Sequence, residues 1–146
     1  PYTVEDSKTI LDVINYNILN STALYDYQPR RLANQITIFE DKLSKGFPII
    51  VATIADTVVG FGYYSEFRFR EAYKFIVEHS VYATPDYVGK GVGKKIMHDL
   101  IDLAKTQKLH TMVAVIDAEN ESSIGFHEKF VFKTVGIIKE SGFKFD

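Results

Sequence analysis

Three glycines alternate with other residues in the stretch YVGKGVGKKI, residues 87–96, and this spacing could bind phosphate. Glycine reaches positive φ, which lets successive backbone N–H groups point into one concavity. A helical pattern begins at once after the turn, and a helix N-terminus adds unpaired N–H donors and the positive end of its dipole. Lys90, Lys94 and Lys95 add positive charge. The stretch therefore predicts an anion site, and the alternative is a flexible loop that only leads into a helix.

Two known phosphate-binding motifs fit this stretch poorly. A P-loop requires G-x-x-x-x-G-K-[ST]. Gly93 and Lys94 could end one, but Val88 and Lys95 stand where a glycine and a hydroxyl are needed. The dinucleotide fingerprint G-x-G-x-x-G follows a first strand, whereas this turn reads G-x-G-x-G and lies more than halfway along the chain.

The elements around the turn must position it. Residues 74–83 read as a strand that ends before Pro85, an amphipathic helix runs from the turn to about Gln107, and residues 111–117 read as a buried strand. Strand, turn, helix and strand form a right-handed βαβ unit by default, so the two strands should be parallel.

The rest of the chain surrounds this unit with further helices and strands. We expect helices at 5–20, from Pro29 to about Gly46 and at 121–130, a strand hairpin at 48–55 and 58–65, and a last strand at 133–140. Strands interleaved with helices indicate an α/β or α+β layered domain. The 146 residues fit one domain.

Composition excludes several classes of protein. The chain has no cysteine, so a disulfide framework or a thiolate zinc site is not possible, and we expect no metal. Its net charge of −2 gives no general attraction to nucleic acid or to an anionic membrane. No apolar run is long enough to span a bilayer, and no export signal stands at the start. We therefore expect a cytoplasmic protein without nucleic-acid or membrane partners.

A second motif, VAVIDAENESSIGFHEKFVF at residues 113–132, follows the glycine turn. Together the two motifs resemble the GNAT superfamily of N-acetyltransferases, and its phosphinothricin (methionine sulfoximine) acetyltransferase branch in particular. The stretches INYNILNSTALYDY and AYKFIVEHSVYATP are also similar to that branch. The resemblance implies a GNAT fold, with a mixed central sheet of about six strands flanked by four helices, as a single N-acetyltransferase domain over residues 1–146.

The resemblance also implies acetyl transfer from acetyl-coenzyme A, as co-substrate, to the amine of a small amino-acid analogue such as phosphinothricin or methionine sulfoximine. A backbone N–H near Val81 or Tyr82 would hold the acetyl carbonyl, because the superfamily splays its strands there. The cofactor-binding candidates are Val81, Tyr82, Val88, Gly89, Lys90, Gly91, Val92, Gly93, Lys94, Asn120 and Ser123.

Two side chains are candidates for the proton transfers of this reaction. Relatives carry a glutamate at the position of Glu78, which could act as base through a water or could only bind the substrate ammonium. His127 stands where many members of the superfamily place a tyrosine acid, and histidine titrates near neutrality. Its alternative is a core histidine without a catalytic role. His79 points to the opposite face of the strand from Glu78, and we expect a structural role for it.

A substrate site is implied for the segment EFRFREAY, residues 66–73. Arg68 and Arg70 can point the same way in an extended segment, and arginine binds carboxylate or phosphinate with two hydrogen bonds. Phe69 and Tyr73 could wall that site. A solvated loop is the alternative.

Some positions depart from the family pattern. Val88 replaces a Gln or Arg, and Val131 replaces a glycine, so we expect that turn to adopt another backbone conformation. Terminal strands of the family could be incomplete in this sequence. The alternatives are an acetyltransferase for another amine, such as a protein N-terminus or a polyamine, or a non-catalytic coenzyme A-binding module. Relatives are often homodimers, which makes a homodimer possible here.

Overall fold

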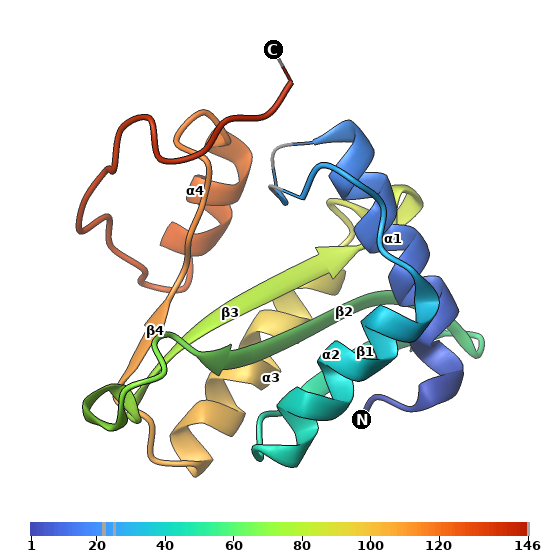
Figure 1. Ribbon diagram of the computed structural model, residues 1–146, viewed down its shortest axis with the longest axis horizontal. Coiled ribbons are helices and arrows are strands. Elements are labelled where there is room, and N and C mark those ends of the chain that lie inside the picture. Colours follow the sequence, from blue (N-terminus) through green and yellow to red (C-terminus); the bar gives the residue numbers. More distant parts are fainter. Residues whose placement is uncertain (22, 25, 146) are drawn as a thin grey trace.

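The computed structural model describes residues 1–21, 23–24 and 26–145, and a four-stranded mixed sheet lies at its centre (Figure 1). The strands are β1 (Ile49–Ile54), β2 (Thr57–Glu66), β3 (Ile76–Ala83) and β4 (Thr111–Val113), in that spatial order. The first three are antiparallel, and β4 is parallel to β3, as the predicted βαβ unit requires.

Helices cover both faces of the sheet (Figure 1). Helices α1 (Ser7–Asn20) and α2 (Leu32–Ser44) pack on one face, with a core that includes Phe39 and Phe61. Helix α3 (Val92–Thr106) packs on the other face, against Tyr64 and Val77. Helix α4 (Glu121–Glu128) follows β4.

Helix α3 approaches β2 closely because two glycines of that strand leave room for it. A Cβ atom at Gly62 would lie 2.4 Å from Ile96 Cγ2, and one at Gly60 would lie 2.6 Å from Val92 Cγ1. The N-terminal turn of α3 is therefore held against the sheet at a fixed depth. Every helix within the described residues is too short or too polar to cross a membrane.

The structure corrects three expectations about the elements. The sheet has four strands among the described residues, where about six were predicted. The strand predicted at 111–117 ends at Val113, and the segment predicted as a last strand at 133–140 has no regular secondary structure. Apolar Val135 and Ile138 in that segment are exposed, since no neighbouring strand pairs with them.

The backbone at Val131 was also predicted wrongly. Its φ of 69° lies in the left-handed region that glycine adopts without strain. The valine thus has the backbone conformation expected of a glycine, and the turn has not changed to another one. A β-branched residue in this region is strained by about 1–3 kcal/mol.

Candidate active site

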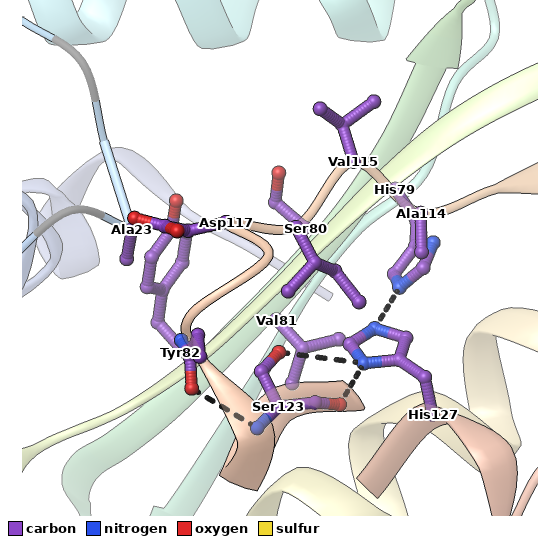
Figure 2. A pocket seen from close by; sticks show the side chains of 12 residues that line it. Ala23, His79, Ser80, Val81, Tyr82, Ala114, Val115, Asp117, Ser123 and His127 are labelled. Carbon is purple, nitrogen blue, oxygen red and sulfur yellow. Dashed lines mark hydrogen bonds between the residues drawn. The ribbon is translucent and has the colours of Figure 1, made fainter. Parts of the chain in front are cut away.

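A cavity opens where β3 and β4 stop pairing. The two strands are paired only from Ile76–Thr111 to Glu78–Val113, and beyond Val113 the chain leaves the sheet (Figure 1). The residues that line the cavity are Ala23, His79, Ser80, Val81, Tyr82, Ala114, Val115, Ile116, Asp117, Asn120, Ser123 and His127 (Figure 2). It thus brings together five of the predicted residues, which are Val81, Tyr82, Asn120, Ser123 and His127.

Residues of β3 line this cavity from both faces of the sheet. Ser80 pairs with Tyr63, which packs on the α1–α2 core, so Ser80 and Tyr82 point toward that side. His79 and Val81 point toward α3 and α4. The cavity is therefore lined by side chains of both faces of the sheet at the gap between the strands.

The backbone of β3 offers a hydrogen-bond donor inside this gap. The Thr84 N–H donates to the Val59 carbonyl of β2, while the Phe75 carbonyl accepts from His110 and Thr111 on the β4 side. Because backbone groups alternate along a strand, the N–H of Val81 faces the β4 side, where pairing has ended. The N–H of Tyr82 faces β2. Of the two predicted donors, Val81 thus has the suitable direction.

The glycine turn has the conformation that an anion cradle requires. Gly89 and Gly91 have φ values of 78° and 86°, and Gly91 is the N-cap of α3. The first helical hydrogen bond runs from Lys95 N–H to the Gly91 carbonyl at 3.1 Å, so the three N–H groups before Lys95 have no acceptor within the helix.

Side chains of the turn add little beyond positive charge. Val88 is 68% exposed and offers no polar group, and Lys90 and Lys94 are exposed. Lys95 instead pairs with Asp99 of the next turn at 3.0 Å. Binding by this turn would therefore depend mainly on its backbone.

Gly93 connects the turn with the cavity, because it packs against one of the lining residues. A Cβ atom there would lie 3.7 Å from Val81 and 3.5 Å from the ring of Phe126 on α4. An extended ligand anchored at the turn would thus pass along α4 toward the gap between the strands.

Helix α4 begins at Asn120, whose side chain caps it. Asn120 Oδ1 accepts the N–H of Ser123 at 3.1 Å, so this oxygen already has a partner. One helical turn later, His127 Nδ1 lies 2.7 Å from the Ser123 carbonyl oxygen and 3.5 Å from Ser123 Oγ. These contacts fix the His127 ring at the wall of the cavity (Figure 2).

Sequence reasoning expected only a structural role for His79 and missed its contact with His127. It lies on the opposite face from Glu78, as expected, but its Nε2 atom lies 2.9 Å from His127 Nε2. It is 6% exposed, and burial together with the neighbouring His127 lowers its pKa to about 4. Helical and strand periodicity place each histidine on a face, but they do not show that two such faces meet.

Glu78 lies apart from the lining residues, on the α1–α2 side of β3. It pairs with Ser65 of β2, whose hydroxyl accepts a hydrogen bond from Lys42 Nζ at 3.1 Å. Burial raises the pKa of Glu78, and the charge of Lys42 partly opposes this increase. A half-buried carboxyl group with a raised pKa is suited to proton abstraction.

The four predicted substrate-binding residues lie on the exposed connection between β2 and β3. Arg68, Phe69, Arg70 and Tyr73 are all exposed, and Phe69 is 93% exposed. The connection enters β3 at Ile76, whereas the cavity is lined by residues further along this strand. The structure therefore does not bring these four residues into the cavity.

A mixed sheet with a glycine turn before its crossover helix, and a gap between its two parallel strands, is the arrangement that the sequence resemblance implies for an N-acetyltransferase. Comparison with known proteins agrees with this class. The model of the acetyltransferase (GNAT) family matches residues 14–132, and the chain belongs to this family.

Relatives with known names are similar over nearly the whole chain. An L-methionine sulfoximine/L-methionine sulfone acetyltransferase of Pseudomonas aeruginosa is 38% identical over 97% of this chain and 83% of its own. The crystal structure of an N-acetyltransferase from Staphylococcus aureus has a TM-score of 0.97 and 39% identity, and covers 99% of this chain and 88% of that one. A phosphinothricin acetyltransferase from Sinorhizobium meliloti in complex with acetyl-coenzyme A has a TM-score of 0.95 and 33% identity, over 98% and 78% of the two chains.

Proposed function

We propose that this chain transfers the acetyl group of acetyl-coenzyme A to the primary amine of a small amino-acid analogue such as methionine sulfoximine or phosphinothricin. The cavity between β3 and the segment after β4 carries this proposal, because it is lined from both faces of the sheet. An acyl donor and an amine can therefore meet there. The names of the relatives supply the class of amine.

The residues of the chain fit an acetyl-coenzyme A molecule that enters along α3 and α4. The backbone N–H groups at the start of α3 would bind its pyrophosphate, with Lys90 and Lys94 nearby. Its pantetheine arm would pass Gly93 and reach Asn120 and Ser123. The N–H of Val81 would then bind the acetyl oxygen, which gains negative charge in the transition state.

Glu78 and His127 would serve the proton transfers from opposite faces of β3. Glu78, on the α1–α2 side, would accept a proton from the amine through a water or would bind the ammonium group. His127, at the wall of the cavity, would protonate the leaving thiolate. We also propose Arg68 and Arg70 as ligands for the anionic group of the amino acid. Because both lie on the exposed β2–β3 connection outside the cavity, this role requires the bound amino acid to extend from the cavity to that connection.

A thiol-release assay tests this proposal. Acetyl-coenzyme A is mixed with the protein and, in separate reactions, with methionine sulfoximine, phosphinothricin, a peptide with a free N-terminus and spermidine. We expect release with the first two amines. Release only with the peptide or spermidine would assign another acceptor. Calorimetric binding of acetyl-coenzyme A without release on any amine would make the chain a binding module.

A further inference from the structure

The contacts of His79 and His127 specify where their protons lie. His79 Nδ1 lies 3.1 Å from the carbonyl oxygen of Val113, and His127 Nδ1 lies 2.7 Å from that of Ser123. A carbonyl oxygen only accepts hydrogen bonds, so both Nδ1 atoms carry a hydrogen. The two Nε2 atoms face each other at 2.9 Å (Figure 2).

These three contacts are incompatible with two neutral rings. A neutral imidazole carries only one N–H, so two rings protonated at Nδ1 would direct two lone pairs at each other across 2.9 Å. One additional proton converts this repulsion into an N–H···N hydrogen bond. We propose that His79 and His127 share one additional proton, and that His79 positions His127 as the proton donor to the leaving thiolate; the second part rests on the proposed function.

Burial decides which ring carries the charge. His79 is the more buried of the two rings, since only 6% of this residue is exposed. The same burial lowers the pKa of His79 to about 4, so this ring stays neutral at ordinary pH. His127, at the cavity wall, therefore carries the additional proton on Nε2, and His79 Nε2 accepts a hydrogen bond from it.

Few charged groups face the pair. The titratable side chains on the surrounding elements are Tyr63, Tyr64 and Glu66 on β2, Glu78 and Tyr82 on β3, Asp117 after β4, Glu121 and Glu128 on α4, and Lys94, Lys95, His98, Asp99, Asp102 and Lys105 on α3. Those of α4 are exposed, as are those of α3 except Asp99, which pairs with Lys95 at 3.0 Å. Tyr63 and Glu78 lie on the opposite face of the sheet, and Glu66 pairs with Lys45 at 3.3 Å. Tyr64 donates to Gln107 Oε1 at 2.6 Å, and burial raises the pKa of the three tyrosines. Asp117 lines the same cavity.

The shared proton gives a balanced chemical step. When the tetrahedral intermediate collapses, the C–S bond breaks and sulfur takes the electron pair. The Nε2 proton of His127 leaves its hydrogen bond with His79 Nε2 and passes to sulfur, which produces the free thiol. The pair is then left with two facing lone pairs, so it takes up a proton from solvent before the next turnover. The proton lost by the amine leaves to solvent through its base.

Histidine NMR tests the shared proton without any turnover. The chain has four histidines, so the imidazole nitrogens of wild type can be assigned by comparison with His79→Gln, His98→Gln and His110→Gln. We expect His127 to be protonated on both nitrogens at pH 7, because the two facing Nε2 atoms need a proton between them. Neutral rings on both residues at pH 7 would overturn the proposal.

Kinetics tests the positioning role with a matched pair of variants. His79→Leu removes the acceptor for the Nε2 proton, whereas His79→Gln can supply an amide oxygen in its place. We expect His79→Leu to lower kcat about 10-fold or more, with an unchanged Kd for acetyl-coenzyme A, and to move the alkaline limb of the pH profile to lower pH. His79→Gln should recover most of the rate, and His110→Gln, on an exposed histidine, should leave it unchanged.

The outcomes separate the two parts of the proposal. Equal losses in His79→Leu and His79→Gln, with the pH profile unmoved, would overturn the positioning role. A shared proton seen by NMR in a protein that acetylates no amine would support the pair and overturn the proposed function. If His79→Leu does not fold, the NMR titration of wild type still tests the shared proton, and the pH profile of kcat in His79→Gln still tests the positioning role.

Discussion

Acid should destabilise this protein through His79 in particular. The pKa of His79 is about 4 in the folded chain, because burial and the neighbouring His127 oppose its protonation, and it is near 6.5 in an unfolded chain. As pH falls from about 6.5 to about 4, the unfolded chain binds a proton on this residue that the folded chain does not. Stability present above pH 6.5 is therefore lost over this window.

The size of the effect follows from the two pKa values. The free energy of unfolding should decrease through His79 by about 2 kcal/mol at pH 5 and by about 3 kcal/mol at pH 4. A typical domain has only about 5–15 kcal/mol of stability, so the loss is a large fraction of the total. His79→Gln has no ionisable group at this position and should lack this part of the pH dependence.

Urea denaturation of wild type and of His79→Gln at pH 7, 6 and 5 measures the difference in their free energies of unfolding. Carboxyl groups contribute equally to the two proteins, so the gap between their stability curves reports on His79 together with its partner His127. We expect the gap to close by about 2 kcal/mol between pH 7 and pH 5. Parallel curves would refute the reasoning, since they would mean that His79 titrates alike in the folded and unfolded chain.

Four glycine positions and one valine supply three further predictions. Gly91→Val places a β-branched residue at a φ of 86° and should raise the Kd for coenzyme A, measured by calorimetry, at least about 10-fold. The control Gly136→Val lies in open space and should leave this Kd unchanged. Equal Kd values for the two variants would leave the turn without a binding role. Gly60→Ala puts a Cβ atom 2.8 Å from a backbone carbonyl oxygen of β3 and should lower the free energy of unfolding by about 1–3 kcal/mol. Gly125→Ala, whose Cβ atom meets nothing within 4 Å, should raise the free energy of unfolding by up to about 1 kcal/mol. A change of the same sign in both variants would contradict the packing described. Val131→Gly relieves a φ of 69° at an exposed position and should raise the free energy of unfolding by about 1 kcal/mol, and a decrease would show that the valine is not strained.

Much of the fold follows from local patterns in the sequence. Pro85 and the glycines after it mark the end of β3 and the start of α3, and this part of the βαβ unit agrees with the structure. The strand count does not follow in the same way. Residues 111–117 and 133–140 have apolar side chains typical of strands, but a strand also needs a neighbour to pair with, and periodicity carries no information about pairing.

Sequence reasoning can bring site residues together where they belong to one element or to a motif with known geometry. His127, Asn120 and Ser123 on α4 and its cap do line the cavity with Val81. The histidine pair joins β3 to α4 across 48 residues of sequence, and no spacing rule links them. The exposed position of Arg68 and Arg70 likewise depends on where the β2–β3 connection leaves the sheet.

The product of the reaction tests the central claim most directly. The protein is incubated with acetyl-coenzyme A and methionine sulfoximine, and free thiol and N-acetylated amino acid are measured in the same sample, by absorbance and by mass spectrometry. We predict that the two products form in equal amounts and that both require the protein. Thiol without the acetylated amino acid would mean hydrolysis instead of transfer, and would contradict an amine site that opens onto the gap between β3 and β4.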